Sequence, residues 1–362
     1  MRHPSRIQPG STNLKIPHKD RKQTSDRSDP HDCTRNLQSG ARDRVARVAI
    51  VGTGFVGATT AYALLITGTV AEIILINRDK KVAEGHVNDL RDAELFTHTT
   101  RVVAGDYSDC ADADVIIITA GVHQTPGMRS RLDDLKESAW ILREIVLEIA
   151  RYDPCGILLI ASNPVDVLTY AAWKWTGLPP SRVIGSGTSL DTSRFRRRLG
   201  ERYGVAPDNV HAYVIGEHGD SQVPALSSAR IAGIPLADFC REQGLTYDEA
   251  ALRSIANETR TAGYQILRAK GATCYGIGAA LTRIVGTILR DEHAVLTVST
   301  LVPESMNLGE VFLSLPAVVD AKGVARVLSI PLNDVEKKAI KTSADILKQY
   351  NKLLDLAKRA AT

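Results

Sequence analysis

The sequence predicts an α/β fold in which a doubly wound parallel sheet is followed by a mixed α+β domain. From Val45 onward, short apolar runs of strand character alternate with helical stretches, which is typical of a parallel sheet with helices on both faces. Beyond Gly185 the alternation loosens into longer helices and short strands. The predicted strands of the first half are Val48–Val51, Ile73–Ile76, Arg101–Ala104, Val115–Thr119 and Ile157–Ala161.

Apolar residues at helical spacing predict the helices between and after these strands. The clearest case is the segment 130–152, in which one apolar stripe would pack on the sheet. The other predicted helices span 55–66, 189–203, 246–289 and 334–358.

Length and composition suit two domains preceded by a polar tail. The chain has 362 residues, of which 44% are hydrophobic and 24% charged, as is ordinary for a globular protein. We place the tail at 1–44, the first domain at 45–185 and the second at 186–362. The tail carries ten Lys or Arg, five Asp and no apolar periodicity, so we expect it to be disordered. The remainder has 35 basic and 36 acidic residues, which gives no electrostatic footprint for nucleic acid.

The cysteine pattern and hydropathy exclude other classes. The five cysteines are odd in number and scattered without C-x-x-C spacing, which indicates a reducing, cytoplasmic setting and no structural zinc. No cluster of His, Cys, Asp and Glu has metal-ligand spacing, so we expect no metal site. No apolar run approaches the roughly 20 residues of a membrane helix, so we expect no membrane insertion.

A glycine-rich turn follows the first strand and points to a dinucleotide. In Gly52-x-Gly54-x-x-Gly57, Gly52 permits a tight turn, Gly54 removes a side chain that would block a pyrophosphate, and Gly57 allows close packing of helix on strand. The helix that begins with Phe55 and Val56 would direct its N-terminus at the phosphates. The first domain is therefore predicted to be Rossmann-type.

The cofactor choice depends on the end of the second strand. Such folds place there an acidic residue that accepts the ribose hydroxyls and repels a 2'-phosphate. Here the residue is the neutral Asn77, followed by Arg78. We take NAD as the cofactor, with Asn77 still bonding the ribose, and keep NADP as an alternative. Ligands lie at the carboxyl ends of parallel strands, so the loops that carry Ala120, Gly121 and Ser162 should meet the glycine loop at one crevice.

A histidine in a glycine-flanked turn is the first candidate for proton transfer. His218 lies in Gly216-Glu-His-Gly-Asp220, just after an apolar run. Three further motifs accompany it in order: the glycine loop, Ser162-Asn-Pro-Val-Asp166 and Gly185-Ser-Gly-Thr-Ser-Leu-Asp-Thr-Ser-Arg194. With these four motifs the chain resembles the lactate/malate dehydrogenase family from about Val45 to its end.

The resemblance implies roles for three residues. His218 would donate a proton to a 2-keto acid as hydride reaches the carbonyl carbon, and Asp191 would orient and stabilise its imidazolium. Arg194 would bind the substrate carboxylate through two parallel hydrogen bonds. Asp191 and Arg194 are three residues apart, so one helical turn can present both.

Two other positions match the family's substrate site. Asn163 would contact the nicotinamide ribose and the reacting oxygen, and a helix N-cap role is compatible with this. Thr273, in Lys270-Gly-Ala-Thr273, would line the pocket for the substrate's side chain.

The segment from Gln124 to Arg131 resembles the family's mobile lid and bears on the substrate. Gln124 stands where malate-type enzymes have an arginine for a second carboxylate, so oxaloacetate would bury an unpaired charge at a cost of at least several kcal/mol. Pyruvate avoids that cost. The lid is one residue longer than usual, so either Arg131 or Arg129 would polarise the substrate carbonyl, and the downstream register favours Arg131.

The resemblance therefore implies an NAD-dependent L-lactate dehydrogenase that interconverts pyruvate and L-lactate. The longer lid keeps a branched-chain 2-hydroxy acid dehydrogenase or a malate dehydrogenase open, and an inactive binding or structural protein is the alternative from another class. Arg196 and His211 resemble the family's fructose 1,6-bisphosphate site between subunits, which suggests a homotetramer with allosteric activation.

Overall fold

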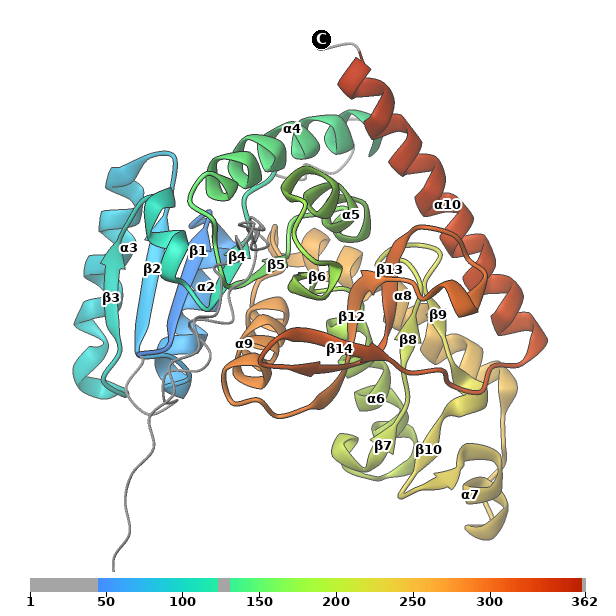
Figure 1. The fold of residues 1–362 in the computed structure, drawn as a ribbon. Helices are drawn as coiled ribbons and strands as arrows, with labels where there is room; N and C mark the ends of the chain where they lie inside the picture. Colours follow the sequence, from blue (N-terminus) through green and yellow to red (C-terminus); the bar gives the residue numbers. More distant parts are fainter. Residues whose placement is uncertain (1–44, 123–130, 360–362) are drawn as a thin grey trace, which may run out of the picture. The chain divides into compact units, whose positions relative to one another are not determined.

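The computed structural model describes residues 45–122 and 131–359 (Figure 1). The predictions for the tail 1–44 and for lid residues 123–130 fall outside this range. Within it, no helix is both long enough and apolar enough to cross a membrane.

A nine-stranded mixed sheet forms the centre of the fold. Its strand order is β14-β13-β12-β6-β5-β4-β1-β2-β3, and the strands from β6 to β3 are parallel. The parallel strands are β1 (Arg47–Val51), β2 (Glu72–Ile76), β3 (Arg101–Ala104), β4 (Val115–Ile118), β5 (Ile157–Ile160) and β6 (Val183–Gly185). The antiparallel strands are β12 (Ala294–Leu301), β13 (Phe312–Asp320) and β14 (Gly323–Val327).

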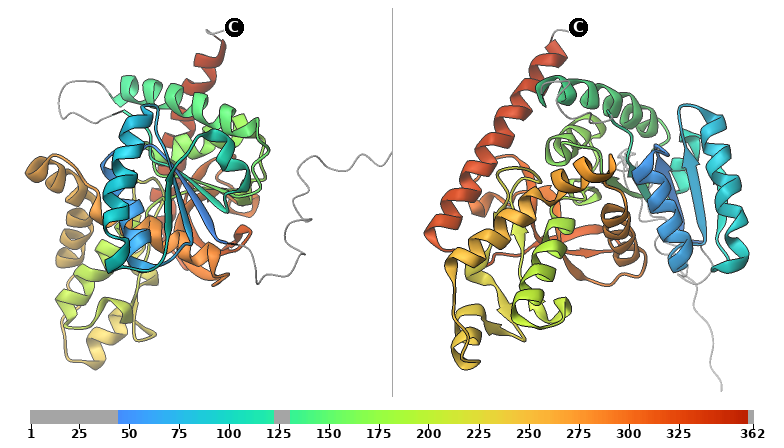
Figure 2. Two further views of the ribbon diagram at one scale, coloured as in Figure 1. Left: turned by 90° about the vertical axis from the view of Figure 1, so that its left-hand side faces the viewer. Right: turned by 180° about the vertical axis from the view of Figure 1, so that it is seen from behind.

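Helices cover both faces of this sheet, as Figures 1 and 2 show. Alternate residues of β1 enter different cores, because successive side chains of a strand point to opposite faces. Val48 and Ile50 pack with α2 (Phe55–Thr67), α3 (Lys80–Asp92) and α9 (Tyr275–Leu289). Ala49 and Val51 belong to the core shared with α4 (Arg131–Ala150), α5 (Val165–Thr176) and α10 (Asp334–Arg359). A sheet buried on both faces explains why its strands are continuous apolar runs.

A third core lies among the elements that follow β6. It is formed around Phe195, Val210 and Leu252, all of which are almost fully buried. The elements of this part are α6 (Ser189–Tyr203), β7 (Val210–His211), β8 (Val214–Ile215), β9 (Val223–Pro224), β10 (Arg230–Ile231), β11 (Ile234–Pro235), α7 (Leu236–Glu242) and α8 (Glu249–Lys270).

The doubly wound α/β prediction is confirmed, and two of its details need correction. The helix predicted over 246–289 is two helices, because Gly271 adopts the left-handed conformation (φ 79°) that ends α8. The strands β12 to β14 extend the parallel sheet itself. The sequence reading also missed β6, a three-residue strand whose burial comes from its place between β5 and β12.

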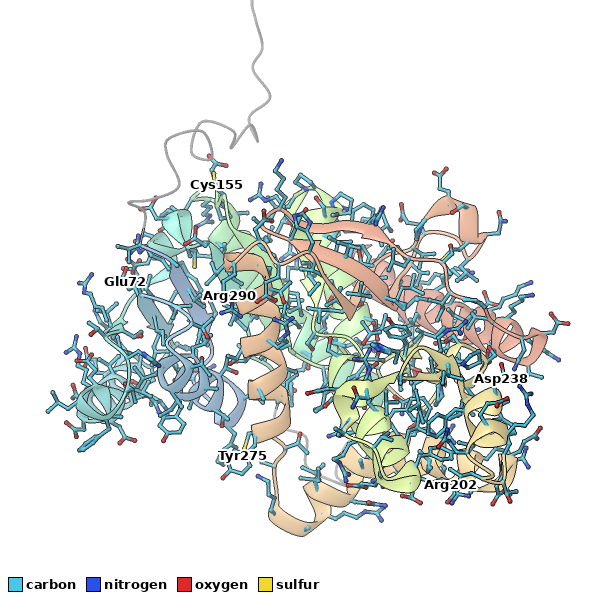
Figure 3. All side chains as sticks on the ribbon, turned by 90° about the horizontal axis from the view of Figure 1, so that it is seen from below. Glu72, Cys155, Arg202, Asp238, Tyr275 and Arg290 are labelled. Atoms are coloured by element: carbon cyan, nitrogen blue, oxygen red, sulfur yellow. The ribbon has the colours of Figure 1, made fainter. Side chains whose placement is uncertain are left out.

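The cysteines in the described residues are of two kinds. Cys110, Cys240 and Cys274 are free and buried, whereas Cys155, labelled in Figure 3 and lying in the loop before β5, is disulfide-bonded. Nothing in the scattered spacing of the cysteines indicated that bond.

Candidate functional site

The turn between β1 and α2 is shaped for a pyrophosphate. Gly52 has φ 98°, and a Cβ on it would lie 2.7 Å from the Ala120 backbone nitrogen. A Cβ on Gly57 would lie 1.9 Å from the Gly52 carbonyl oxygen, whereas one on Gly54 would meet nothing within 4 Å. Two of the glycines are therefore needed for packing, and Gly54 leaves open space beside the helix N-terminus.

The first turn of α2 suits an anion. No side chain caps this helix, and its first turn contains no acidic residue. Phe55 and Val56 are its first residues; the Phe55 side chain is exposed, and Val56 lines the cavity described below. The partial positive charge of a helix N-terminus can thus act on a bound phosphate.

The carboxyl ends of four parallel strands meet beside this turn. Asn77, after β2, donates from Nδ2 to the Thr53 hydroxyl at 2.6 Å. Ser162, after β5, donates from Oγ to the Ala120 carbonyl at 2.5 Å, and a Cβ on Gly121 would lie 3.7 Å from the Ser162 Cβ. The structure therefore brings together the residues that the sequence assigned to the dinucleotide.

A cavity of about 280 Å³ continues from this crevice into the second half of the chain. Residues assigned from the sequence to cofactor, substrate and proton transfer share its wall, which includes Val56, Asn163, Asp191, Arg194, His218 and Thr273. Asn163 precedes Pro164, which occupies the cap position of α5 with no side-chain hydrogen bond, so Asn163 does not cap that helix.

His218 is paired with a buried carboxylate. Its Nδ1 lies 2.6 Å from Asp191 Oδ2, and the side chain of Asp191 is only 4% exposed. With the Nδ1 proton directed at Asp191, Nε2 remains the position for proton exchange with a ligand. Arg194 Nη1 donates to the other oxygen of Asp191 at 3.0 Å, as their three-residue spacing on α6 allows.

The electrostatics of the pair favour a charged imidazole. Burial alone would lower the pKa of His218, but the Asp191 carboxylate outweighs it, and the pKa is raised. Burial acts against the charge of Asp191 too, yet His218 and Arg194 hold the pKa of that carboxyl below its ordinary value. The site can therefore hold a proton for delivery above the pH at which free histidine loses it.

A second carboxylate bonds the backbone of His218, and the sequence alone assigned it no role. Asp166 on α5 accepts the His218 backbone N–H at 2.7 Å and is 2% exposed. Its Oδ1 and the nearby Ser299 hydroxyl oxygen are buried and have no hydrogen-bond partner among the residues that the structure describes. Burial raises the pKa of Asp166 to about 6, against the smaller effects of the Ser299 dipole and the His218 N–H. Only its position in the Ser162–Asp166 motif could have drawn attention to it.

Other polar residues of the wall were also missed. Gln222 is buried, and its Oε1 has no hydrogen-bond partner. Tyr264 on α8 donates its hydroxyl to Asp220 at 3.2 Å, and Arg260 donates to the Asp220 carbonyl at 3.4 Å. In a sequence, each of these polar residues is indistinguishable from an ordinary surface residue. Only the fold brings them together around one cavity.

The two residues assigned to an activator site, Arg196 and His211, lie on α6 and β7. Arg196 on α6 donates from Nε to the Ala212 carbonyl at 2.9 Å, and its guanidinium lies 5.3 Å from the centre of the Tyr213 ring. Burial lowers the pKa of Arg196. His211 on β7 is exposed.

The lid assignments stay predictions. Gln124 and Arg129 lie outside the described residues. Arg131 is the first residue of α4, and the structure does not describe its side chain.

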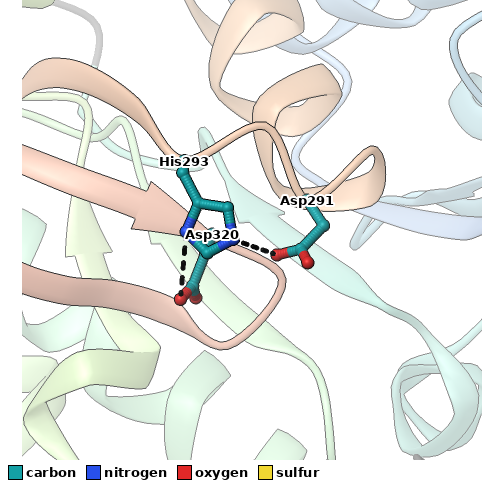
Figure 4. Close-up of side chains that lie close together, drawn as sticks. All are labelled: Asp291, His293 and Asp320. Carbon is teal, nitrogen blue, oxygen red and sulfur yellow. Dashed lines mark ion pairs between the residues drawn. The ribbon is translucent and has the colours of Figure 1, made fainter.

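One group of side chains in the described ranges could hold a metal ion, and it lies away from the cavity wall. His293 is between two carboxylates (Figure 4). Its Nε2 is 3.6 Å from Asp291 and its Nδ1 is 3.9 Å from Asp320. Since the carboxylates face different ring nitrogens, the arrangement fits two ion pairs better than a set of ligands converging on one ion.

Comparison with known proteins agrees with this geometry. Residues 46–185 match the family model of the lactate/malate dehydrogenase NAD binding domain, and residues 188–355 match that of the lactate/malate dehydrogenase alpha/beta C-terminal domain. A probable L-lactate dehydrogenase of Schizosaccharomyces pombe is 48% identical over 302 residues, which cover 83% of this chain and 91% of that protein. The L-lactate dehydrogenase of Moorella thermoacetica is 46% identical over 312 residues, or 86% of this chain and 98% of that protein.

A solved structure shows the same fold. The minor L-lactate dehydrogenase of Enterococcus mundtii, in its ligands-bound form, superimposes with a TM-score of 0.82 at 40% identity, covering 85% of this chain and 98% of that one. Both family models, the curated relatives and this structure point to the same family. The chain therefore belongs to the lactate/malate dehydrogenase family.

Proposed function

We propose that the protein is an NAD-dependent L-lactate dehydrogenase that interconverts pyruvate and (S)-lactate. The observation that carries this proposal is the cavity in which His218, Asp191 and Arg194 stand beside the dinucleotide crevice. Several relatives of 40–48% identity bear the name L-lactate dehydrogenase, and they support the same activity. Reoxidation of NADH by pyruvate would place the reaction in cytoplasmic fermentation.

The His–Asp pair supplies the proton. NADH, when bound in the dinucleotide crevice, would supply the hydride for the carbonyl carbon of pyruvate. As it does, His218 gives its Nε2 proton to the carbonyl oxygen, and Asp191 holds the ring in the orientation and charge state that this requires. In the reverse direction the neutral imidazole accepts the hydroxyl proton of lactate.

Arg194 binds the substrate carboxylate. One of its nitrogens is occupied by Asp191, and a guanidinium has further N–H groups arranged as a planar fork. That fork can form paired hydrogen bonds to a carboxylate while its link to Asp191 keeps it in register with His218. Asn163 and Thr273 occupy other parts of the same wall and would contact the reacting oxygen and the methyl group.

The substrate proposal rests on the neutral Gln124. Purified protein would be assayed for NADH oxidation with pyruvate, oxaloacetate and 2-ketoisocaproate at equal concentrations. Pyruvate should give the highest kcat/KM, because oxaloacetate would leave a second carboxylate without a cation. Faster turnover of 2-ketoisocaproate or oxaloacetate would make that compound the assigned substrate in place of pyruvate. Turnover of none of the three would contradict the proposal.

The lid arginine is tested separately. If Arg131 polarises the carbonyl, Arg131→Gln should lower kcat for pyruvate far more than Arg129→Gln, with little change in NADH affinity. The reverse ranking would assign the role to Arg129.

We further propose a homotetramer activated by fructose 1,6-bisphosphate, with Arg196 and His211 contributing to the anion site. Support comes from the exposure of His211 and its place directly before Ala212, the carbonyl partner of Arg196. Sedimentation would measure the mass, and pyruvate saturation curves with and without the bisphosphate would measure activation. A response that persists in His211→Gln would remove His211 from the site.

A further inference from the structure

The end of β2 carries a neutral amide where a dinucleotide's adenosine ribose is read. Asn77 is held in place by both ends of its amide: Nδ2 donates to the Thr53 hydroxyl at 2.6 Å, and Oδ1 accepts the Asp79 backbone N–H at 3.0 Å. Thr53 is itself part of the glycine loop and is buried. The side chain is therefore fixed beside the crevice, and its orientation does not depend on a bound ribose.

An arginine follows directly on the exposed side of this turn. Arg78 is exposed, and within the described residues no hydrogen bond or ion pair engages its guanidinium. The neighbouring Asp79 does not neutralise it, since that carboxylate caps α3 by accepting the Lys81 backbone N–H at 3.0 Å.

The charges around the turn do not oppose an additional anion. Lys80 and Lys81 begin α3, and Asp106, in the turn after β3, is close enough to Lys80 to interact with it. The Asp106 carboxylate is occupied by the backbone N–H and hydroxyl of Ser108. Three cations thus share the turn with two carboxylates, each of which caps a helix.

We propose that Asn77 and Arg78 make this a site for a 2'-phosphorylated adenosine ribose, so that the protein takes NADPH as well as NADH. A carboxylate at position 77 would repel a 2'-phosphate, whereas an amide does not, and an unpaired guanidinium one residue away is the partner such a phosphate needs. The inference extends the proposed function to a second electron donor. In the balanced reaction, pyruvate, NADPH and a proton give lactate and NADP⁺; hydride leaves NADPH for the carbonyl carbon, and the proton comes through His218.

Binding of the adenosine half alone tests this inference without catalysis. Calorimetric titration of the full-length protein would compare 2',5'-ADP with 5'-AMP. We expect the wild type to bind 2',5'-ADP with an affinity within about tenfold of that for 5'-AMP, or higher. Affinity more than about a hundredfold lower, as expected where like charges meet, would overturn the inference.

Three variants test which residues bind the 2'-phosphate. Arg78→Gln should lower the affinity for 2',5'-ADP by about tenfold or more, the usual loss for a hydrogen bond to a charged group. The affinity for 5'-AMP should stay unchanged. Asn77→Asp should weaken 2',5'-ADP at least as much. Arg241→Gln, on the exposed surface of α7, removes the same charge elsewhere and should change neither ligand. An equal response of both ligands to Arg78→Gln, or no response, would overturn the inference.

The kinetic readout separates this inference from the proposed activity. We expect kcat/KM for pyruvate reduction with NADPH within about a hundredfold of that with NADH, and a wider ratio in Arg78→Gln and Asn77→Asp. Turnover with NADH but none with NADPH would contradict the inference and leave the dehydrogenase proposal standing. Absence of turnover with either cofactor, together with tight 2',5'-ADP binding, would contradict only the dehydrogenase proposal.

Discussion

The two ends of the crevice are built in different ways. At the dinucleotide end, Gly52, Thr53 and Asn77 lie close in sequence, and their arrangement is decided by backbone contacts so tight that a methyl group could not enter at Gly52 or Gly57. At the catalytic end, Asp166, Asp191 and His218 come from separate elements and are joined by buried charges. The first end depends on shape and the second on electrostatics. Mutations at the first should therefore change binding and folding, and mutations at the second should change proton transfer and its pH dependence.

Removal of the imidazole should give the largest effect. His218→Ala should lower kcat for pyruvate reduction by about 10²–10⁴, the usual contribution of a general acid. NADH affinity, measured by fluorescence, should stay near the wild-type value, because the dinucleotide end is independent. Residual activity within about tenfold of wild type would show that His218 does not supply the proton.

Removal of the partner charge should move the pH profile. The raised pKa of His218 keeps the imidazolium above the ordinary histidine range, and kcat/KM for pyruvate should fall as pH rises through that pKa. In Asp191→Asn the carboxylate charge is lost, so the fall should occur at lower pH. The pH dependence of kcat/KM measures this directly. A profile that keeps the wild-type position would mean that Asp191 does not set the imidazole's charge.

Two glycines distinguish packing from binding at the other end. Gly57→Ala should destabilise the fold by about 1–3 kcal/mol and weaken NADH binding, since its Cβ would overlap the Gly52 carbonyl. Gly54→Ala should leave thermal unfolding nearly unchanged, because its Cβ meets nothing within 4 Å. It should weaken NADH binding, because the added methyl group would occupy the space of the phosphates. Each of these two variants serves as the control for the other. Equal losses of stability in both variants would contradict the assignment.

The effect expected at Asp166 is on stability alone. Its folded pKa of about 6 lies above the ordinary aspartate value, so its ionisation destabilises the fold as pH rises through that range. Asp166→Asn stays neutral, and its stability relative to wild type should therefore increase between pH 4 and pH 7 by about 1–3 kcal/mol. Urea unfolding at both pH values would measure it. A constant difference would show that this carboxylate does not titrate as its burial implies.

The sequence predicted much of both ends, though for different reasons. The glycine loop and the strand before it have a local signature, because the glycine spacing and the apolar run that precedes it stand next to each other in the chain. Asp191 and Arg194 could be paired with each other from their helical spacing, and with His218 only through the family resemblance. Asp166 could not be paired with the His218 backbone, because 52 residues separate them and the contact needs α5 to pack beneath that turn.

The sequence by itself determined the alternation of strands and helices, the glycine turn and the residue types needed for hydride and proton transfer. Local sterics and apolar periodicity act over short stretches, so they can be read without coordinates. Only the tertiary structure decided that the antiparallel strands β12 to β14 extend the parallel sheet, that Asp191 bonds the His218 ring while Asp166 bonds its backbone N–H, and that no side chain in the described ranges pairs with Arg78. Burial and charge pairing depend on which distant segments meet, and these are properties of the folded chain.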